Sequence, residues 1–189
     1  MMFKRTRAIA LLIPSLALVA PGTAWSDPES ATHAVLGWVE RITLEPWGFT
    51  IKARLDTGAQ TSSMQAERIE RFDRGNREWA RFILELDDAQ DEDGRPTEPG
   101  VEVERPVVRD ALIKEFDGSY DRRPVVTLEF CLNGRRFNAE FSLKDRSLLT
   151  YPALLGRGFL ADIALIDPGK TFLGTGACPP CPGVEPARQ

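Results

Sequence analysis

Short segments in which apolar and polar residues alternate make up most of the chain between residues 35 and 173. Alternation gives an extended strand one apolar face, whereas an amphipathic helix needs apolar residues three or four positions apart. Glycine, proline, asparagine and aspartate separate the segments, as expected for turns between strands. The pattern predicts strands at 35–44, 49–55, 79–86, 101–108, 111–116, 125–132, 135–143, 153–157, 163–166 and 171–173.

Two of the predicted turns indicate hairpins. The dipeptide Asn133-Gly134 favours the tight turn of a two-residue hairpin, and Asp117-Gly118 marks the tip of a second one. Only residues 65–72 and 157–161 have a spacing that suits a short helix. Many short strands joined by frequent turns predict an all-β fold, a closed β-barrel or sandwich with one or two short helices.

The first 26 residues have the layout of a secretory signal peptide. Lys4, Arg5 and Arg7 precede an apolar stretch at 8–20, and small residues follow up to Ser26. The apolar stretch is short beside the roughly 20 residues of a membrane span, so we expect cleavage after Ser26 rather than an uncleaved membrane anchor. These features predict an exported, periplasmic protein with no stable membrane insertion after cleavage.

The remaining chain is predicted to form one domain. Residues 27–34 are polar and are expected to be flexible, residues 35–174 hold the strand pattern, and residues 175–189 are a proline-rich tail. Without the three basic residues of the signal peptide, the formal net charge changes from −4 to −7. The sequence contains no basic cluster, so nucleic acids and anionic membranes are excluded as partners on electrostatic grounds.

The three cysteines are Cys131, Cys178 and Cys181. In an oxidising compartment, Cys178 and Cys181 are expected either to close a small disulfide loop in the tail or to remain as two free thiols. Cys131 lies within an apolar strand pattern, which predicts a small buried side chain.

Several kinds of catalytic site are excluded by residue content. The chain has one histidine, His33, whereas a catalytic zinc usually takes three protein ligands drawn mainly from His, Cys and Glu. Serine and cysteine hydrolases also need a histidine, and no glycine-rich phosphate loop is present. The acidic residues at 87–100 lack the ordered spacing of a calcium loop. We therefore expect no metal and no cofactor, which leaves carboxylates as candidate catalytic groups.

Asp56 is the strongest candidate among the carboxylates. The strand at 49–55 ends directly before it, and Thr57, Gly58 and Ala59 follow. A strand fixes the position of the carboxylate, and small residues allow a second backbone to approach closely. Two carboxyl groups held close together share one proton, so one can act as a base on water while the other acts as an acid.

The segment Leu55-Asp56-Thr57-Gly58-Ala59 resembles the active-site loop of retropepsin-type aspartic peptidases. Leu155-Gly156-Arg157 resembles the apolar-Gly-Arg segment that flanks this loop, and the hairpin before it occupies the same place in the order. Residues 35–173 are similar to a bacterial retropepsin-related family that carries the label "ATP-dependent zinc protease". Gln60 departs from that family, which commonly has a basic residue at this position, and from the acidic residue of retroviral proteases.

The resemblance implies an exported aspartic endopeptidase with Asp56 as its catalytic residue. One Asp-Thr-Gly in one domain then requires a second copy of the chain, so we expect a homodimer with Thr57 bonded across its two-fold axis. A flap at 109–122, with Phe116, Asp117 and Gly118 near its tip, would cover a polypeptide substrate. Arg157, without the retroviral acid, would need another partner or face solvent.

Two other functions remain open from the sequence. The chain could be a non-catalytic exported β-barrel binding module, in which Asp56 is only a turn residue. A metallopeptidase would agree with the family label, but the single histidine and the unordered acids at 87–93 argue against it. The acidic segment 87–100 is the second candidate for a cover over the substrate. Arg122 and Arg123, at the end of the expected flap, could equally be charges that protect an edge strand from aggregation.

Overall fold

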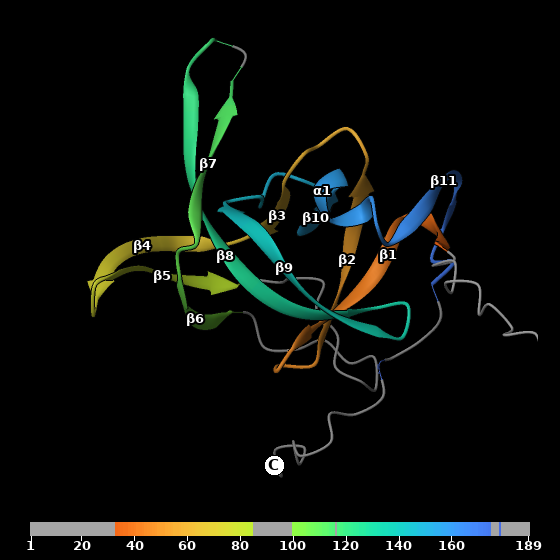
Figure 1. Cartoon of the computed structure of the whole chain (residues 1–189), viewed down its shortest axis with the longest axis horizontal. Helices are drawn as coiled ribbons and strands as arrows, with labels where there is room; N and C mark the ends of the chain where they lie inside the picture. The colour runs from red at the N-terminus through yellow and green to blue at the C-terminus, as the bar shows by residue number, and fades with distance from the viewer. Residues whose placement is uncertain (1–32, 85–99, 116, 175–177, 179–189) are drawn as a thin grey trace, which may run out of the picture. The chain divides into compact units, whose positions relative to one another are not determined.

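The computed structural model describes residues 33–84, 100–115, 117–174 and 178. Eleven strands and one short helix lie within these ranges (Figure 1). They are β1 (Ala34–Glu45), β2 (Phe49–Asp56), β3 (Ser62–Gln65), β4 (Glu67–Arg74), β5 (Arg77–Leu84), β6 (Val101–Pro106), β7 (Arg109–Lys114), β8 (Tyr120–Leu132), β9 (Arg135–Lys144), β10 (Ala153–Gly156), α1 (Arg157–Leu160) and β11 (Ala164–Thr171).

Eight of the strands form one sheet that closes on itself. Its order is β11-β1-β2-β10-β3-β9-β8-β7, and an additional pairing of β1 with β8 closes six of these strands into a barrel. The prediction of an all-β closed barrel is therefore confirmed. Closure leaves β11 and β7 outside the barrel, one at each end of the strand order.

Apolar side chains from the alternating segments fill the barrel. Phe130 of β8 contacts the rings of Phe137 and Phe141 of β9 and of Phe159 of α1, at centroid distances of 5.4–5.9 Å. Phe130 and Phe141 are fully buried, and Leu55 and Leu155, the residues before the last in two neighbouring strands, are also buried. This packing gives the ends of β2 and β10 a rigid base.

A second sheet, in the order β4-β5-β6, lies outside the barrel. Ala80, Phe82 and Leu84 of β5 are buried on one face. On the other face, Arg81 donates to the Glu104 carboxylate at 2.7 Å, in the alternation expected for a sheet with one solvated side.

The expected helix at 65–72 is wrong, because this segment forms the end of β3 and most of β4. The pairing of β4 with β5 shifts between Glu67 and Glu70, and Arg68 has a φ of 47°. This bulge interrupts the alternation and leaves Ile69 and Phe72 three residues apart, which is also a helical spacing. The expected strands at 163–166 and 171–173 are replaced by the single strand β11, whereas a short helix at 157–160 is confirmed.

The cysteine pairing differs from the expected one. Cys131 is buried as predicted, but it forms a disulfide with Cys178, at a Cα–Cα distance of 5.8 Å. The chain after β11 is held in this region by the buried carboxylate of Glu40, which accepts the N–H groups of Leu173 and Gly174 at 2.9 and 3.1 Å. The disulfide joins cysteines that are 47 residues apart in sequence, so no local pattern indicates the pairing.

Several predictions fall on residues outside the described ranges. They are the signal peptide at 1–26, most of the segment at 27–34, the acidic residues at 87–99, the flap residue Phe116, Cys181 and nearly all of the tail at 175–189. No helix in the described part of the chain is both long and apolar enough to cross a membrane.

Candidate active site

Asp56 is the last residue of β2, and its carboxylate organises the turn that follows. Its Oδ1 accepts the N–H groups of Gly58 at 2.9 Å and Ala59 at 3.3 Å. Its Oδ2 lies 3.4 Å from a guanidinium nitrogen of Arg54, and 22% of the side chain is exposed. The carboxylate is therefore fixed in direction and still reachable from solvent.

Strand β10 runs parallel to β2 and places Gly156 beside Asp56. A Cβ atom at Gly156 would lie 2.8 Å from the carbonyl carbon of Thr61 and 2.9 Å from the carbonyl oxygen of Ala59. Such distances are too short for any side chain, so glycine is required where the two backbones meet.

Backbone and hydroxyl hydrogen bonds tie β10 and α1 to the loop. The N–H groups of Arg157 and Gly158 donate to the carbonyl oxygens of Ala59 at 2.8 Å and Gln60 at 3.1 Å. The N–H of Gly156 donates to the buried hydroxyl of Ser62 at 3.0 Å. The structure thus brings residues 155–157 against the loop that begins at Asp56.

Arg157 has a neutral partner in place of the missing acid. Its Nε donates to Gln60 Oε1 at 2.9 Å, and a terminal nitrogen lies 3.4 Å from the carbonyl oxygen of Gly58. The expectation that Arg157 needs another partner is met by Gln60 itself. Thr57 is exposed, and the hydrogen bond expected for it across a dimer axis stays a prediction.

The expected flap is a long hairpin of β7 and the first part of β8, which rises beyond the barrel (Figure 1). Gly118 has a φ of 86°, and its N–H donates to the carbonyl of Glu115 at 3.1 Å. The Ser119 hydroxyl and N–H lower the pKa of the Asp117 carboxyl. Asp117 and Gly118 therefore form the described part of the tip.

The base of this hairpin is tied to the second sheet. Asp110 of β7 pairs with Arg71 of β4 and with Arg122 of β8, whose Nε donates at 2.7 Å. Hydrogen bonds from Arg71 and Arg122 lower the pKa of the Asp110 carboxyl below its usual value. Arg122 is thus a structural partner within the hairpin, and Asp110 links the flap to β4.

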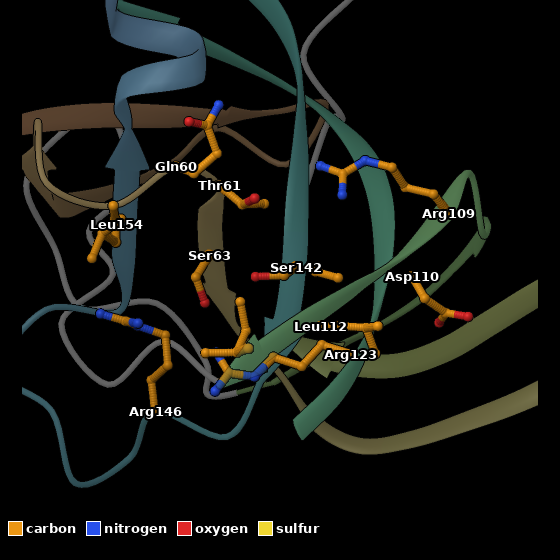
Figure 2. Close-up of a pocket in the computed structure, with 13 residues that line it drawn as sticks. Gln60, Thr61, Ser63, Arg109, Asp110, Leu112, Arg123, Ser142, Arg146 and Leu154 are labelled. Carbon is orange, nitrogen blue, oxygen red and sulfur yellow. The ribbon is translucent and has the colours of Figure 1, made fainter. Parts of the chain in front are cut away.

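A cavity of about 470 Å³ lies between the hairpin base and the active-site loop (Figure 2). Its wall comes from the loop, β3, β7, β8, β9 and β10, together with the segment after β9. The lining residues are Ala59, Gln60, Thr61, Ser63, Arg109, Asp110, Ala111, Leu112, Ile113, Arg123, Ser142, Arg146 and Leu154.

Sequence reasoning missed Ser63 and Arg146 as site residues and gave Arg123 only an edge-strand role. These residues come from separate parts of the chain, and only the closure of the barrel brings them together. No local pattern distinguishes them, because a serine in a strand and an arginine after a hairpin are common. In the described ranges, no group of three or more His, Cys, Asp and Glu side chains is placed to hold a metal ion.

A family model matches most of the chain. The model described as RimB-like, "Retropepsin-like aspartic endopeptidase RimB", matches residues 35–176. This description agrees with the retropepsin part of the predicted resemblance and contains neither ATP nor zinc.

Curated relatives carry a different name. Proteins of Desulfotalea psychrophila and Shewanella pealeana, both named "Probable alpha-L-glutamate ligase", are 36% and 34% identical over 121 and 126 residues. The matches cover 62% and 65% of this chain but only 24% and 25% of the relatives, so the chain spans about a quarter of their length.

A crystal structure of a Legionella pneumophila protein of unknown function is similar in fold. It superposes with a TM-score of 0.60 at 28% identity, over 75% of this chain and 98% of the other.

Proposed function

Because the chain belongs to the RimB-like family of retropepsin-like aspartic endopeptidases, we propose that it hydrolyses peptide bonds with Asp56 as the catalytic residue. One observation carries the proposal. The Asp56 carboxylate lies at the end of a buried strand, in a loop held by β10 and α1 through three hydrogen bonds. Catalysis by positioned carboxylates requires this combination of fixed direction and solvent access.

A two-carboxylate site requires a second protomer, because the chain has one Asp-Thr-Gly sequence. In the proposed homodimer, the two Asp56 side chains face each other across a two-fold axis. The exposure of Thr57 and Gly58 at the tip of the loop supports this arrangement, since the same surface must meet itself.

The proposed reaction uses one shared proton and one water molecule. The ionised carboxylate takes a proton from water, whose oxygen attacks the carbonyl carbon of the scissile peptide bond. The protonated carboxyl of the other Asp56 gives its proton to the carbonyl oxygen, which produces a neutral tetrahedral intermediate. Collapse of the intermediate, with protonation of the nitrogen, breaks the C–N bond and releases a carboxyl and an amine product.

The hairpin of β7 and β8 is the proposed cover over the bound polypeptide, because its base forms one wall of the cavity beside the loop. Export to the periplasm is proposed from the layout of residues 1–26, and it makes an exported polypeptide the substrate. We do not extend a ligase activity to this chain, because the match covers only a quarter of the proteins with that name.

A peptide-library cleavage assay with Asp56→Asn tests the catalytic assignment. We expect the rate to fall on the order of 1,000-fold or more, because the substitution removes the acid–base group and keeps its shape. Asp73→Asn is the matched control, since Asp73 is exposed on β4 in the second sheet. Peptide binding without cleavage by the wild-type protein would favour the binding module instead.

The dimer and the metal-free mechanism have separate tests. Sedimentation velocity with and without a peptide is expected to show a dimer, and a strictly monomeric active protein would contradict the shared site.

Treatment with a chelator is expected to leave activity unchanged, whereas a loss of activity would favour a metallopeptidase.

A further inference from the structure

The cavity beside the active-site loop contains a positive charge for which the described residues offer no carboxylate. Arg146 is only 8% exposed, and its Nε donates to the carbonyl oxygen of Tyr151 at 3.2 Å. No acidic side chain in the described part of the chain forms an ion pair with it. A buried charge without a counter-charge costs free energy, so this arrangement indicates a site for an anion.

The neighbours of Arg146 increase its need for an anion. Burial, and then the positive charges of Arg123 and Arg54, lower the pKa of the Arg146 guanidinium. The side chain still carries its charge at neutral pH, because the usual pKa of arginine is far above neutrality. Arg123 also lines the cavity, but it already pairs with Asp121 at 2.6 Å and Glu115 at 3.4 Å.

Ser63 provides a second, independent indication. Ser63 is 5% exposed, and its buried hydroxyl oxygen has no hydrogen-bond partner among the described residues. Ser63 lines the same cavity as Arg146 and Arg123 (Figure 2). A buried hydroxyl without a partner is uncommon in proteins and is satisfied when a ligand supplies an acceptor.

We propose that this cavity is a substrate subsite for one carboxylate, which Arg146 binds as counter-charge and to which Ser63 donates a hydrogen bond. The charge count selects a carboxylate over a doubly charged phosphate. Among the other charged lining residues, Arg109 pairs with Glu140, Asp110 with Arg71 and Arg122, and Arg123 with Asp121 and Glu115, so Arg146 contributes one uncompensated charge. Guanidinium groups also match the geometry of a carboxylate through two parallel hydrogen bonds. The carboxylate can be an aspartate or glutamate side chain or a free chain terminus.

The subsite deepens the proposed function and rests on it for its place in the reaction. Leu154 and Gln60 line the cavity. Leu154 lies on β10, which ends at Gly156 beside Asp56, and Gln60 lies in the loop that begins at Asp56. In a homodimer, each protomer contributes one such cavity. A substrate with a carboxylate on either side of the scissile bond would therefore be preferred over one with a single carboxylate.

Binding to Asp56→Asn separates this inference from catalysis. The full-length variant is titrated by calorimetry with Ac-Ala-Ala-Glu-Ala-Ala-NH2, with its Gln counterpart, and with the Gln counterpart carrying a free C-terminal carboxylate. We expect one of the two carboxylate-bearing peptides to bind at least about ten-fold more tightly than the uncharged one, and this peptide identifies the source of the carboxylate. Equal binding of all three peptides would overturn the proposal.

Substitutions in the Asp56→Asn background locate the effect. Arg146→Met is expected to abolish the ten-fold preference, and Arg146→Lys to restore part of it. Arg77→Met, at the exposed first residue of β5 in the second sheet, is expected to leave it unchanged. A preference that survives Arg146→Met in a folded protein would overturn the assignment.

A stability test does not depend on any peptide. Ser63→Asp places a carboxylate inside the cavity, and Ser63→Asn is its uncharged control of the same shape. We expect the Asp variant to unfold at a temperature roughly 2–4 °C above the Asn variant, because its charge pairs with Arg146. A lower unfolding temperature for the Asp variant would show that the cavity does not favour an anion.

Cleavage by the wild-type protein distinguishes the two proposals. Selective binding without any cleavage would leave the subsite in place and contradict the peptidase. Cleavage of the Glu, Gln and free-acid peptides with the same kcat/KM would leave the peptidase in place and contradict the subsite.

Discussion

Ser62 and Ser63 are adjacent buried residues of β3, and they belong to two regions that are built differently. The Ser62 hydroxyl accepts the N–H of Gly156, and the Ser62 carbonyl accepts the hydroxyl of Ser142 at 3.0 Å. The Ser63 hydroxyl has no hydrogen-bond partner in the described part of the chain. Since successive side chains of a strand point to opposite faces, one serine faces the active-site loop and the other faces the cavity.

The two regions therefore differ in role: the loop around Asp56 is held rigid, and the cavity beside it has groups free to bind a ligand. Around Asp56, internal hydrogen bonds hold the loop in one geometry before any substrate arrives. In the cavity, an arginine and a hydroxyl remain available to a ligand. The fold thus satisfies the groups that position the proposed catalytic carboxylate and leaves unsatisfied the groups that would select the substrate.

The largest combined effect on stability and activity in this comparison is expected from Gly156→Ala, which disturbs the rigid region. Its Cβ would lie 2.8–2.9 Å from backbone atoms of Thr61 and Ala59, so the loop or β10 must move. We expect a loss of about 1–3 kcal/mol in the free energy of unfolding and on the order of 100-fold in kcat. Urea unfolding and cleavage assays measure both.

Gly169→Ala is the matched control for this substitution. Its nearest atom outside the neighbouring residues is the exposed Asp167 carboxylate oxygen at 3.3 Å, and its backbone does not require glycine. Equal losses of stability and kcat in the two variants would show that the close backbone contact at Gly156 does not cause the effect.

A large effect on stability is also expected from loss of the Cys131–Cys178 disulfide, which lies outside both regions. Closing a loop of 47 residues is worth roughly 2–4 kcal/mol. Replacing both cysteines by alanine should lower the urea midpoint accordingly and leave the preference among the three peptides unchanged. A changed preference would mean that the C-terminal segment also shapes the cavity.

The direct test of the comparison is the pair Ser62→Ala and Ser63→Ala. Removing the Ser62 hydroxyl leaves a buried N–H without a partner, which costs about 1–3 kcal/mol. Removing the Ser63 hydroxyl removes an unpaired group, so the free energy of unfolding should change by about 0.5 kcal/mol or less. Urea unfolding measures both, and equal losses would remove the distinction between the two regions.

The smallest effect concerns Asp110, which ties the flap to the second sheet and also lines the cavity. Arg71 and Arg122 lower its pKa in the folded protein, so stability from this site is present above about pH 4 and is lost as the pH falls through the lowered value. Asp110→Asn should therefore lose stability less steeply in acid than the wild type.

Urea midpoints measured between about pH 3 and pH 6 test this expectation. Asp73→Asn, on the same second sheet, should keep the wild-type dependence on pH. If Asp110→Asn also keeps it, the ionised Asp110 does not stabilise the fold.

Most of the barrel could be predicted from sequence, because alternation and turn residues act locally, whereas the place of Gly156 beside the Asp56 loop was implied by the family resemblance. The segment at 65–72 could not, because its bulge gives Ile69 and Phe72 a helical spacing. The partner of Cys178 could not either, because it lies 47 residues away in sequence. The cavity depends in the same way on strands that meet only in the closed barrel.

Because Arg157 binds a neutral side chain, the contact that anchors the active-site loop does not depend on the ionisation of an acid. Between Thr57 and Thr61 the loop has no ionisable side chain, and the Gln60 amide that receives Arg157 does not titrate. Acidification therefore leaves the hydrogen bond between Gln60 and Arg157 in place. A chain with an acid at residue 60 would lose this anchor when the acid took up a proton, whereas the amide of Gln60 keeps it.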